Sequence, residues 1–301
     1  YAWRFWQPIL NLSNLYNTFI NAVAYLERIF EMIDEPVTVD DAPGATDLPP
    51  ITGRVTFDDV TFSYDGKINI LEHFNLDVKP GESIALVGPT GAGKTTVVNL
   101  ISRFYNINSG RLLLDGHDIA GVTLHSLRSQ MGIMLQDSFI FSGTIMDNIR
   151  YGRLDATDAE VEAAARTVSA DQVAAKLEKG WDSDVGEGGD RLSTGEKQLI
   201  SFARAVLADP RIFVLDEATS SIDTQTEQLI QNAIDHLLRD RTSFLIAHRL
   251  STIRKADLIL VVRDGRIVEQ GRHLELLQKG GYYHDLYTRQ FAEESAARIL
   301  K

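Results

Sequence analysis

The sequence predicts an α/β domain built on a largely parallel sheet. Short apolar segments, such as residues 83–87 (SIALV) and 212–215 (IFVL), alternate along the chain with stretches of strong helix formers. Strands of a parallel sheet are covered by helices on both faces, so they are continuous apolar runs rather than alternating ones. The chain has 301 residues, a length typical of about two domains.

The first 35 residues differ from the rest of the chain. Residues 1–30 contain only three charged residues and are rich in Trp, Phe, Tyr, Leu and Ile. Polar side chains such as Gln7, Asn14 and Asn21 interrupt every apolar run, whereas a self-sufficient membrane span needs about 20 predominantly apolar residues. The segment therefore fits two interpretations: an amphipathic helix packed on a soluble domain, or one helix of a membrane bundle whose amides face other helices.

Residues 36–52 are predicted to form a linker. Four of the eight prolines lie between residues 36 and 50, and proline at this density interrupts helices and strands alike. The chain begins with Tyr1 rather than with methionine, so we expect it to be a fragment or a processed product. It lacks the basic segment, apolar stretch and cleavage site of a signal peptide.

From residue 53 onwards, turn signals separate the predicted elements. The Asp65-Gly66 pair separates two alternating segments and predicts a turn between two strands. Helix formers fill residues 155–179, and Asp155 or Thr157 is a suitable N-cap for them. The other predicted helices are residues 94–104, 196–208 and 282–300, and the predicted strands are residues 54–64, 68–78, 83–87, 111–114, 212–215, 243–247, 258–262 and 266–269.

The composition excludes several classes of function. The chain contains no cysteine, which rules out a disulfide scaffold and a thiolate metal site. Its formal net charge of −12 argues against a general nucleic-acid-binding protein, because such a protein needs a basic face. The charge does not exclude a nucleotide ligand, since local N–H groups and one lysine can hold a phosphate in an acidic protein.

A glycine-rich segment after the strand at residues 83–87 is the strongest functional motif. It fits the pattern G-x-x-x-x-G-K-[ST] and lies between a predicted strand and a predicted helix, as that motif requires. Glycines allow the backbone N–H groups to turn inward around a phosphate, Lys94 would reach the β and γ phosphates, and Thr95 would place its hydroxyl on Mg²⁺. The predicted nucleotide contacts are Gly88, Pro89, Thr90, Gly91, Ala92, Gly93, Lys94, Thr95 and Thr96.

Two adjacent carboxylates follow the apolar run at residues 212–215. Asp216 stands at the carboxyl end of a predicted buried strand, where an acid points into the site of an α/β sheet, and it is the candidate ligand of Mg²⁺. Glu217 is adjacent and on the opposite side, so it is free to polarise an attacking water as a general base.

A third segment, Ser193-Thr194-Gly195, precedes a predicted helix. The N-terminus of a helix with a hydroxyl and a glycine is suited to an anion. Taken alone, the segment is better explained as a serine N-cap with Glu196 in the first turn.

Together these motifs resemble, in type and order, the nucleotide-binding domain of ABC transporters. The resemblance covers residues 53–291 and rests on the glycine-rich loop, Gln136 after a strand, and residues 192–195, 216–217, 220–223 and 246–249. Residues 5–8 and 24–30 resemble the cytosolic end of the last membrane helix of ABC exporters, which favours the bundle interpretation of residues 1–35. The multidrug and lipid exporters are the branch that the chain resembles most.

The resemblance implies a more detailed fold. We expect a P-loop NTPase core with a mostly parallel sheet, an antiparallel β subdomain and an α-helical subdomain at about residues 137–208. Residues 1–35 would come from a membrane bundle, and residues 292–301 would form the tail of a C-terminal helix.

The resemblance also implies roles for single residues. Tyr64 would stack on adenine, with a core aromatic in a strand as the alternative. Ser193 and Gly195 would contact the nucleotide from a second domain. The remaining implied roles are Glu217, His248, Gln136 and Lys94 in catalysis, Thr95, Gln136 and Asp216 as metal ligands, Asp223 at the partner domain and Glu187 at the intracellular loops.

Domains of this family hydrolyse Mg-ATP between two copies packed head to tail. The resemblance therefore implies an ATPase on the cytoplasmic face of the cell membrane that drives export. Its cofactors would be ATP and Mg²⁺. Its partners would be a second nucleotide-binding domain, the transmembrane domain of the same exporter and the membrane, and not nucleic acid. The alternative is the ATPase subunit of an importer or a non-transport ABC ATPase.

Two positions depart from the family signature Leu-Ser-Gly-Gly-Gln. Thr194 replaces its first glycine, and Glu196 replaces its glutamine. Glu196 adds a negative charge, which we expect Lys197 to offset in part. A modified signature beside an intact catalytic side fits one half of an asymmetric heterodimer, and it equally fits a homodimer that tolerates the variant.

Overall fold

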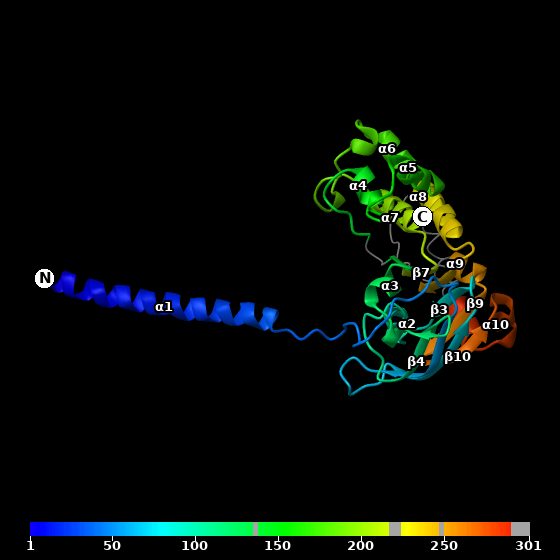
Figure 1. Ribbon diagram of the computed structural model, residues 1–301, viewed down its shortest axis with the longest axis horizontal. Coiled ribbons are helices and arrows are strands. Elements are labelled where there is room, and N and C mark those ends of the chain that lie inside the picture. The colour runs from blue at the N-terminus through cyan, green and yellow to red at the C-terminus, as the bar shows by residue number, and fades with distance from the viewer. Residues whose placement is uncertain (135–137, 217–223, 247–249, 290–301) are drawn as a thin grey trace. The chain divides into compact units, whose positions relative to one another are not determined.

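The computed structural model describes residues 1–134, 138–216, 224–246 and 250–289. The chain divides into two units, Tyr1–Asp40 and Asp41–Lys301 (Figure 1). The first unit is the helix α1 (Ala2–Ile33) and the residues that follow it. Among the described residues, no helix combines the length and the apolar character needed to cross a membrane.

The division between the units falls inside the linker predicted for residues 36–52. From Asp41 onwards this segment packs on the second unit without forming a helix or a strand, and Leu48 and Ile51 are buried in its core. The backbone N–H of Leu48 donates to Ser126 Oγ at 2.8 Å, and that of Ile51 donates to Gln130 Oε1 at 2.9 Å. Proline disfavours helices and strands in such a segment, and the buried apolar side chains hold its path on the second unit.

A six-stranded sheet forms the centre of the second unit. Its strand order is β10-β9-β3-β8-β7-β6, and every neighbouring pair from β9 to β6 is parallel. Only β10 is antiparallel, because the tight turn at Asp264-Gly265 joins it to β9. The predicted parallel sheet is therefore confirmed. Its strands are β3 (Ser83–Val87), β6 (Met131–Met134), β7 (Ile212–Asp216), β8 (Thr242–Ile246), β9 (Leu258–Arg263) and β10 (Arg266–Gly271).

A separate antiparallel sheet packs against this one. It has the order β2-β1-β4-β5, made by β1 (Val55–Phe62), β2 (Leu71–Val78), β4 (Ser109–Leu114) and β5 (His117–Asp118). Its apolar face and the helix α2 (Lys94–Ile101) share one hydrophobic core with the central sheet. Short helices at Ile119–Gly121 (η1) and Leu124–Arg128 (α3) follow β5.

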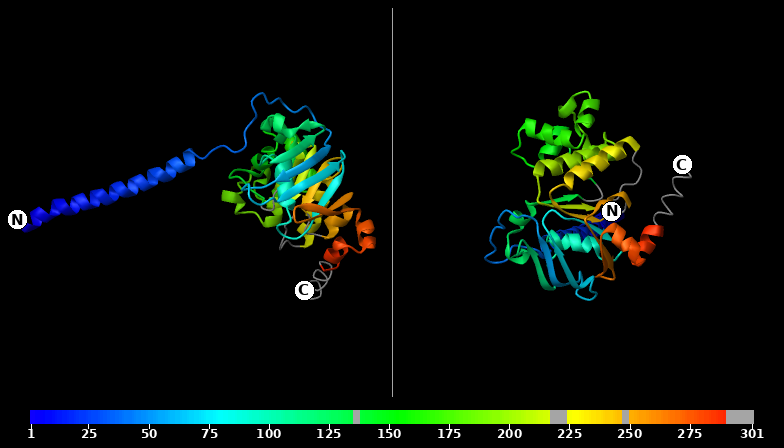
Figure 2. Two further views of the ribbon diagram at one scale, coloured as in Figure 1. Left: turned by 90° about the horizontal axis from the view of Figure 1, so that it is seen from below. Right: turned by 90° about the vertical axis from the view of Figure 1, so that its right-hand side faces the viewer.

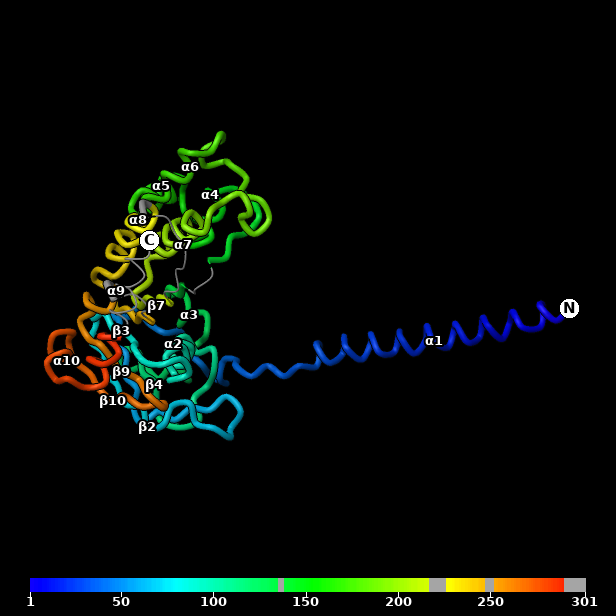
Figure 3. The backbone as a smooth tube through the Cα atoms, turned by 180° about the vertical axis from the view of Figure 1, so that it is seen from behind, coloured from blue at the N-terminus to red at the C-terminus, as the bar shows by residue number. Residues whose placement is uncertain are grey.

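A group of helices lies together on one side of the second unit (Figures 2 and 3), and its hydrophobic core includes side chains of β6, β7 and β8. The helix predicted for residues 155–179 is two helices, because Ser169 adopts a left-handed backbone (φ +60°) that ends the first. The group comprises α4 (Ile145–Arg150), α5 (Asp158–Thr167), α6 (Asp171–Lys176), α7 (Thr194–Ala208) and α8 (Thr224–Leu237), with the 3-10 turns η2 (Gly180–Asp182) and η3 (Glu187–Gly189).

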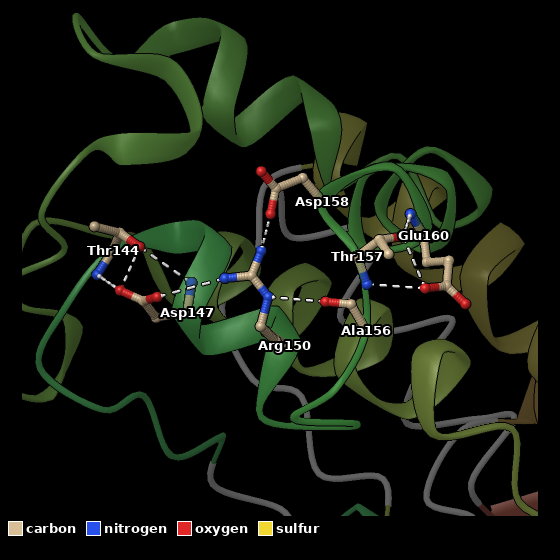
Figure 4. Close-up of polar contacts among 7 residues, drawn as sticks. All are labelled: Thr144, Asp147, Arg150, Ala156, Thr157, Asp158 and Glu160. Atoms are coloured by element: carbon tan, nitrogen blue, oxygen red, sulfur yellow. Dashed lines mark hydrogen bonds and ion pairs between the residues drawn. The ribbon is translucent and has the colours of Figure 1, made fainter.

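Side-chain caps define where these helices begin (Figure 4). Thr144 and Asp147 form a capping box at α4, and Thr157 and Glu160 form one at α5, so Thr157 is the N-cap rather than Asp155. Arg150 joins the two helices, since it donates to the carbonyl of Ala156 and pairs with Asp158. Such a box satisfies N–H groups that a helix leaves without intrahelical partners.

The C-terminal part of the described chain covers another face of the central sheet. The helices α9 (Leu250–Lys255) and α10 (His273–Lys279) and a helical segment at residues 282–289 share a small core with β3 and β9. Tyr283 is the largest side chain buried there. The rest of the helix predicted for residues 282–300, and the tail predicted for residues 292–301, lie outside the described residues.

Candidate nucleotide-binding site

The glycine-rich loop joins the end of β3 to the start of α2. Gly88 has a φ of +154°, and a Cβ placed on it would lie 2.1 Å from the carbonyl oxygen of Val262. Gly93 is the N-cap of α2 with a φ of +102°. Glycine adopts these backbones without strain. The loop can therefore pass close to β9 at Gly88 and close to Ile70 and Leu71 at Gly93.

Lys94 is folded over the loop that precedes it. Its Nζ donates to the carbonyl oxygens of Gly88 at 2.7 Å and Pro89 at 2.9 Å. Burial lowers the pKa of Lys94 from its ordinary value, and the negative charge of Asp216 partly opposes this shift. The ammonium group is thus held against the carbonyls at the start of the loop, where a phosphate bound by the loop would complement it.

The start of α2 is suited to an anion. A helix leaves its first N–H groups without intrahelical partners, and its N-terminus carries a partial positive charge. The N-cap residue Gly93 has no side chain that could accept from them, and Thr95 is exposed in the first turn. These groups fit a phosphate chain together with the hydroxyl that Mg²⁺ would need.

Asp216 lies at the carboxyl end of β7, on the same edge of the sheet as the loop. Strands β3, β8 and β7 are parallel neighbours, so their carboxyl ends meet at one edge. The negative charge of Asp216 favours the charged form of Lys94, in agreement with their position at this common edge. The described residues contain no cluster of three His, Asp or Glu side chains that would hold a metal unaided.

Tyr64 lies beside the start of α2 and is half-exposed. Its hydroxyl is 3.1 Å from Thr96 Oγ1, and its ring meets the rings of Phe62 and Tyr105 edge-on, each at 4.8 Å. Since 49% of Tyr64 is exposed, it is not the core aromatic that was the alternative interpretation. Thr96 itself is buried, so its hydroxyl holds the tyrosine rather than facing solvent.

The predicted signature residues are at the start of α7. Ser193 is the N-cap and forms a capping box with Glu196, and Gly195 is buried in the first turn. Lys197, which was expected to offset the charge of Glu196 in part, donates to the carbonyl of Gly188 at 3.0 Å. Glu196 pairs with Lys176, an ion pair that the sequence reading missed because the two residues lie on different helices.

The structure brings only part of the predicted site together. Gly88 to Thr96, Tyr64 and Asp216 gather around the start of α2, whereas Ser193 and Gly195 belong to α7 in the helical group. The helices α2 and α7 pack into different hydrophobic cores. The predicted residues Gln136, Glu217, Asp223 and His248 lie outside the described residues.

Residues 71–220, which include the glycine-rich loop and the start of α7, match the family model of the ABC transporter domain. The chain belongs to the ABC transporter family. This chain is similar to a solved structure of a bacterial Atm1-family ABC exporter with ATP bound, with a TM-score of 0.81. The two are 44% identical, and the match covers 95% of this chain and 50% of the exporter chain. The P-loop NTPase fold expected from the sequence is confirmed.

Curated relatives of the ABC domain extend beyond it. The chain is 52% identical over 291 residues to the ABC transporter ATP-binding protein YfiC of Bacillus subtilis, covering 97% of this chain and 48% of YfiC. It is 50% identical over 287 residues to the fatty acid ABC transporter ATP-binding/permease protein of Mycobacterium tuberculosis, covering 95% of this chain and 45% of the relative. The chain thus spans about half the length of the curated relatives it matches.

Proposed function

We propose that this chain binds and hydrolyses Mg-ATP as the ATPase part of an ABC exporter on the cytoplasmic face of a membrane. The observation that carries the proposal is the loop from Gly88 to Thr95, with Lys94 folded over it and the charge of Asp216 acting on Lys94. The match to a solved exporter with ATP bound supports it. An importer subunit is not favoured, because the M. tuberculosis relative is an ATP-binding/permease protein.

The proposed nucleotide contacts follow from this geometry. The N–H groups of the loop and of the first turn of α2 would hold the phosphates, and Lys94 would exchange its bonds to the carbonyls of Gly88 and Pro89 for phosphate oxygens. The half-exposed ring of Tyr64 would pack on the adenine. Mg²⁺ would neutralise charge on the phosphates, held by Thr95 and Asp216 together with Gln136.

Hydrolysis would be an in-line attack of water on the γ-phosphate. Such a reaction is promoted mainly by positioning and by electrostatic stabilisation of the charge on the transferred group. Glu217 would orient and polarise the water, His248 would contact the γ-phosphate and hold Glu217, and Lys94 would stabilise the charge that develops.

The complete site would be shared between two ABC domains. Ser193 and Gly195 belong to a different core from the loop, so the loop of one domain would meet the α7 start of a second domain packed head to tail. ATP held by both would close the pair, and its hydrolysis would remove the shared ligand. The second domain would be a copy of this chain or a different chain.

The contact with the transmembrane domain is proposed at an aromatic patch made by Phe139, Phe141 and Tyr151. Their exposed fractions are 66%, 37% and 55%, and apolar patches of this kind mark interaction surfaces. Arg204 packs over the rings of Phe141 and Tyr151 and donates to the carbonyl of Phe139 at 3.0 Å, which fixes the patch. Gln136 and Glu187 would join this contact, and α1 would be the cytosolic end of the last membrane helix.

The Mg-ATPase rate of the purified chain, measured against its own concentration, tests the proposal. We expect a specific activity that rises with concentration, because two domains are needed for one site. The Glu217→Gln variant is the blank, since it would keep ATP binding and lose turnover. Near-normal hydrolysis in that variant would contradict the assignment of the general base, and the absence of ATP binding by the wild-type chain would contradict the proposal as a whole.

A further inference from the structure

The start of α7 carries a negative charge where the proposed function requires an anion site. Glu196 lies in the first turn of the helix, three residues after Ser193. A carboxylate there stabilises an isolated helix but repels an approaching phosphate. The structure also contains the group that offsets this charge, and the inference drawn from it rests on the proposed function.

The carboxylate of Glu196 is held by both of its oxygens. Oε2 accepts from the backbone N–H and the hydroxyl of Ser193, each at 3.0 Å. Oε1 is 3.2 Å from the Nζ of Lys176, on α6. Glu196 is largely covered, with 20% of its side chain exposed, so its charge is not simply screened by water. The ammonium of Lys176 is therefore the counter-charge that holds this carboxylate.

We propose that Lys176 is a positioning residue of the signature site. Its ammonium fixes Oε1 and cancels the charge of Glu196, so the positive end of α7 and the hydroxyl of Ser193 are left to receive the triphosphate of ATP bound to a second copy of this chain. When the phosphate binds, the hydroxyl of Ser193 keeps its proton and changes its hydrogen-bond acceptor from Glu196 Oε2 to a phosphate oxygen. Lys176 stays on Glu196 and keeps it in place.

The second departure from the family signature is also accommodated. Thr194 is the first residue of α7, its side chain is exposed, and it is absent from the positive-φ residues of the described chain. Helical backbone needs no glycine, so the replacement causes no strain at this position. Both departures are thus accommodated within the chain. A second copy of it therefore suffices as the partner, because each copy carries the loop and the start of α7.

A double-mutant cycle on ATP-dependent self-association tests the inference. The 301-residue chain with Glu217→Gln, which would trap bound ATP, is compared with the same chain carrying Lys176→Ala, Glu196→Gln or both, by sedimentation with Mg-ATP and with Mg-ADP. We expect Lys176→Ala to weaken the Mg-ATP dimer about two- to fivefold per site, because it exposes the phosphate to an uncompensated carboxylate. Once Glu196→Gln is present, adding Lys176→Ala has no further effect.

Lys179→Ala is the matched control. It removes the same charge three residues away, and no ion pair of Lys179 occurs among the described residues. Its dimer affinity is expected to match that of the parent chain. The melting temperature is measured for every variant, and ATP affinity is measured at concentrations below those at which the chain dimerises. A purely structural role of Lys176 would lower the melting temperature and leave the affinity of the Mg-ATP dimer unchanged.

Each other outcome overturns the inference. If Lys176→Ala weakens the Mg-ATP dimer equally with and without Glu196→Gln, Lys176 does not act through Glu196. If Lys176→Ala leaves self-association unchanged, Lys176 has no role at the signature site. A chain that binds ATP but never self-associates overturns the second-copy partner while leaving the proposed ATP site intact. A chain that does not bind ATP overturns the proposed function, and the inference falls with it.

Discussion

The glycine-rich loop before α2 and the start of α7 are both helix N-termini proposed to meet one phosphate chain, but they are built in opposite ways. At α2 the N-cap is Gly93, without a side chain, and the cation Lys94 lies over the loop. At α7 the N-cap Ser193 is closed into a capping box with the anion Glu196. The loop can receive a phosphate without losing a side-chain cap. At the start of α7, the hydroxyl of Ser193 must first give up its hydrogen bond to Glu196.

This difference suggests the order of events at the proposed site. Lys94 only has to exchange neutral carbonyl acceptors for charged phosphate oxygens, which are stronger partners. Ser193 has to exchange one carboxylate for another anion, a nearly balanced change. We therefore expect the nucleotide to bind at the loop first, and closure onto α7 to be the weaker and more easily tuned step.

The largest expected effect is on nucleotide binding at the glycine-rich loop. Lys94→Ala removes the cation over the loop, and we expect the affinity for Mg-ATP to fall about a hundredfold, since a hydrogen bond to a charged group is worth about 1.5–3 kcal/mol. Titration calorimetry measures the affinity, and Lys79→Ala, in the exposed turn before β3, controls for the change in net charge. An unchanged affinity in Lys94→Ala would refute the phosphate loop.

The second expected effect concerns the backbone of the loop. Gly88→Ala would put a Cβ against the carbonyl of Val262, so we expect the free energy of unfolding to fall by about 2–3 kcal/mol. Gly91→Ala is the control, because Gly91 also has a positive φ of +81° but its Cβ would meet nothing within 4 Å. It should cost about 1 kcal/mol. Equal losses in urea unfolding would mean that contact with β9 does not shape the loop.

The third expected effect separates the ring of Tyr64 from its hydroxyl. Tyr64→Ala should weaken ATP binding by about 1–3 kcal/mol, by analogy with the stacking of bases on aromatic side chains. Tyr64→Phe keeps the ring and loses only the bond to Thr96, so its affinity should stay near that of the wild type. If the two variants bind ATP equally, the ring does not contact the base.

The smallest expected effect is on the cap of α7. Ser193→Ala should lower the free energy of unfolding by about 1 kcal/mol at neutral pH. Burial acts to raise the pKa of Glu196, but hydrogen bonds from Ser193 and Lys176 outweigh it and hold the pKa below its ordinary value of 4.5. A carboxyl group whose pKa is lowered by folding stabilises the protein fully when the pH is above its ordinary pKa. This stabilisation is lost as the pH falls through the lowered pKa of the folded state.

The cost of Ser193→Ala should therefore shrink as the pH falls through the lowered pKa of Glu196 and this carboxylate becomes protonated. Unfolding in urea at several pH values measures it. Thr157→Ala is the comparator, because it opens the same kind of box at α5. It should reduce stability in a similar way but leave ATP-dependent self-association unchanged. A loss of self-association in Thr157→Ala would mean that the helical group, rather than the α7 start, controls closure.

The sequence predicted features whose parts are adjacent in the chain. The loop from Gly88 to Thr95, the caps at Thr157 and Ser193, and the strand ending at Asp216 all depend on residues within one turn or one strand. Backbone preference and local hydrogen bonding decide such features, and both can be read from a short window of residues. The resemblance to ABC domains added the order in which these pieces occur.

Other features depend on residues far apart in the sequence. The sequence did not reveal that Lys176 rather than Lys197 pairs with Glu196, that Val262 forbids a side chain at Gly88, or that Leu48 and Ile51 bury part of the predicted linker. Each of these depends on which surfaces meet once the helices and sheets pack, and packing is not encoded in local preference. The sequence by itself therefore determined which groups are candidates to bind a nucleotide. Only the tertiary structure decided that they fall into two separate cores, so the loop and the α7 start are not parts of one core.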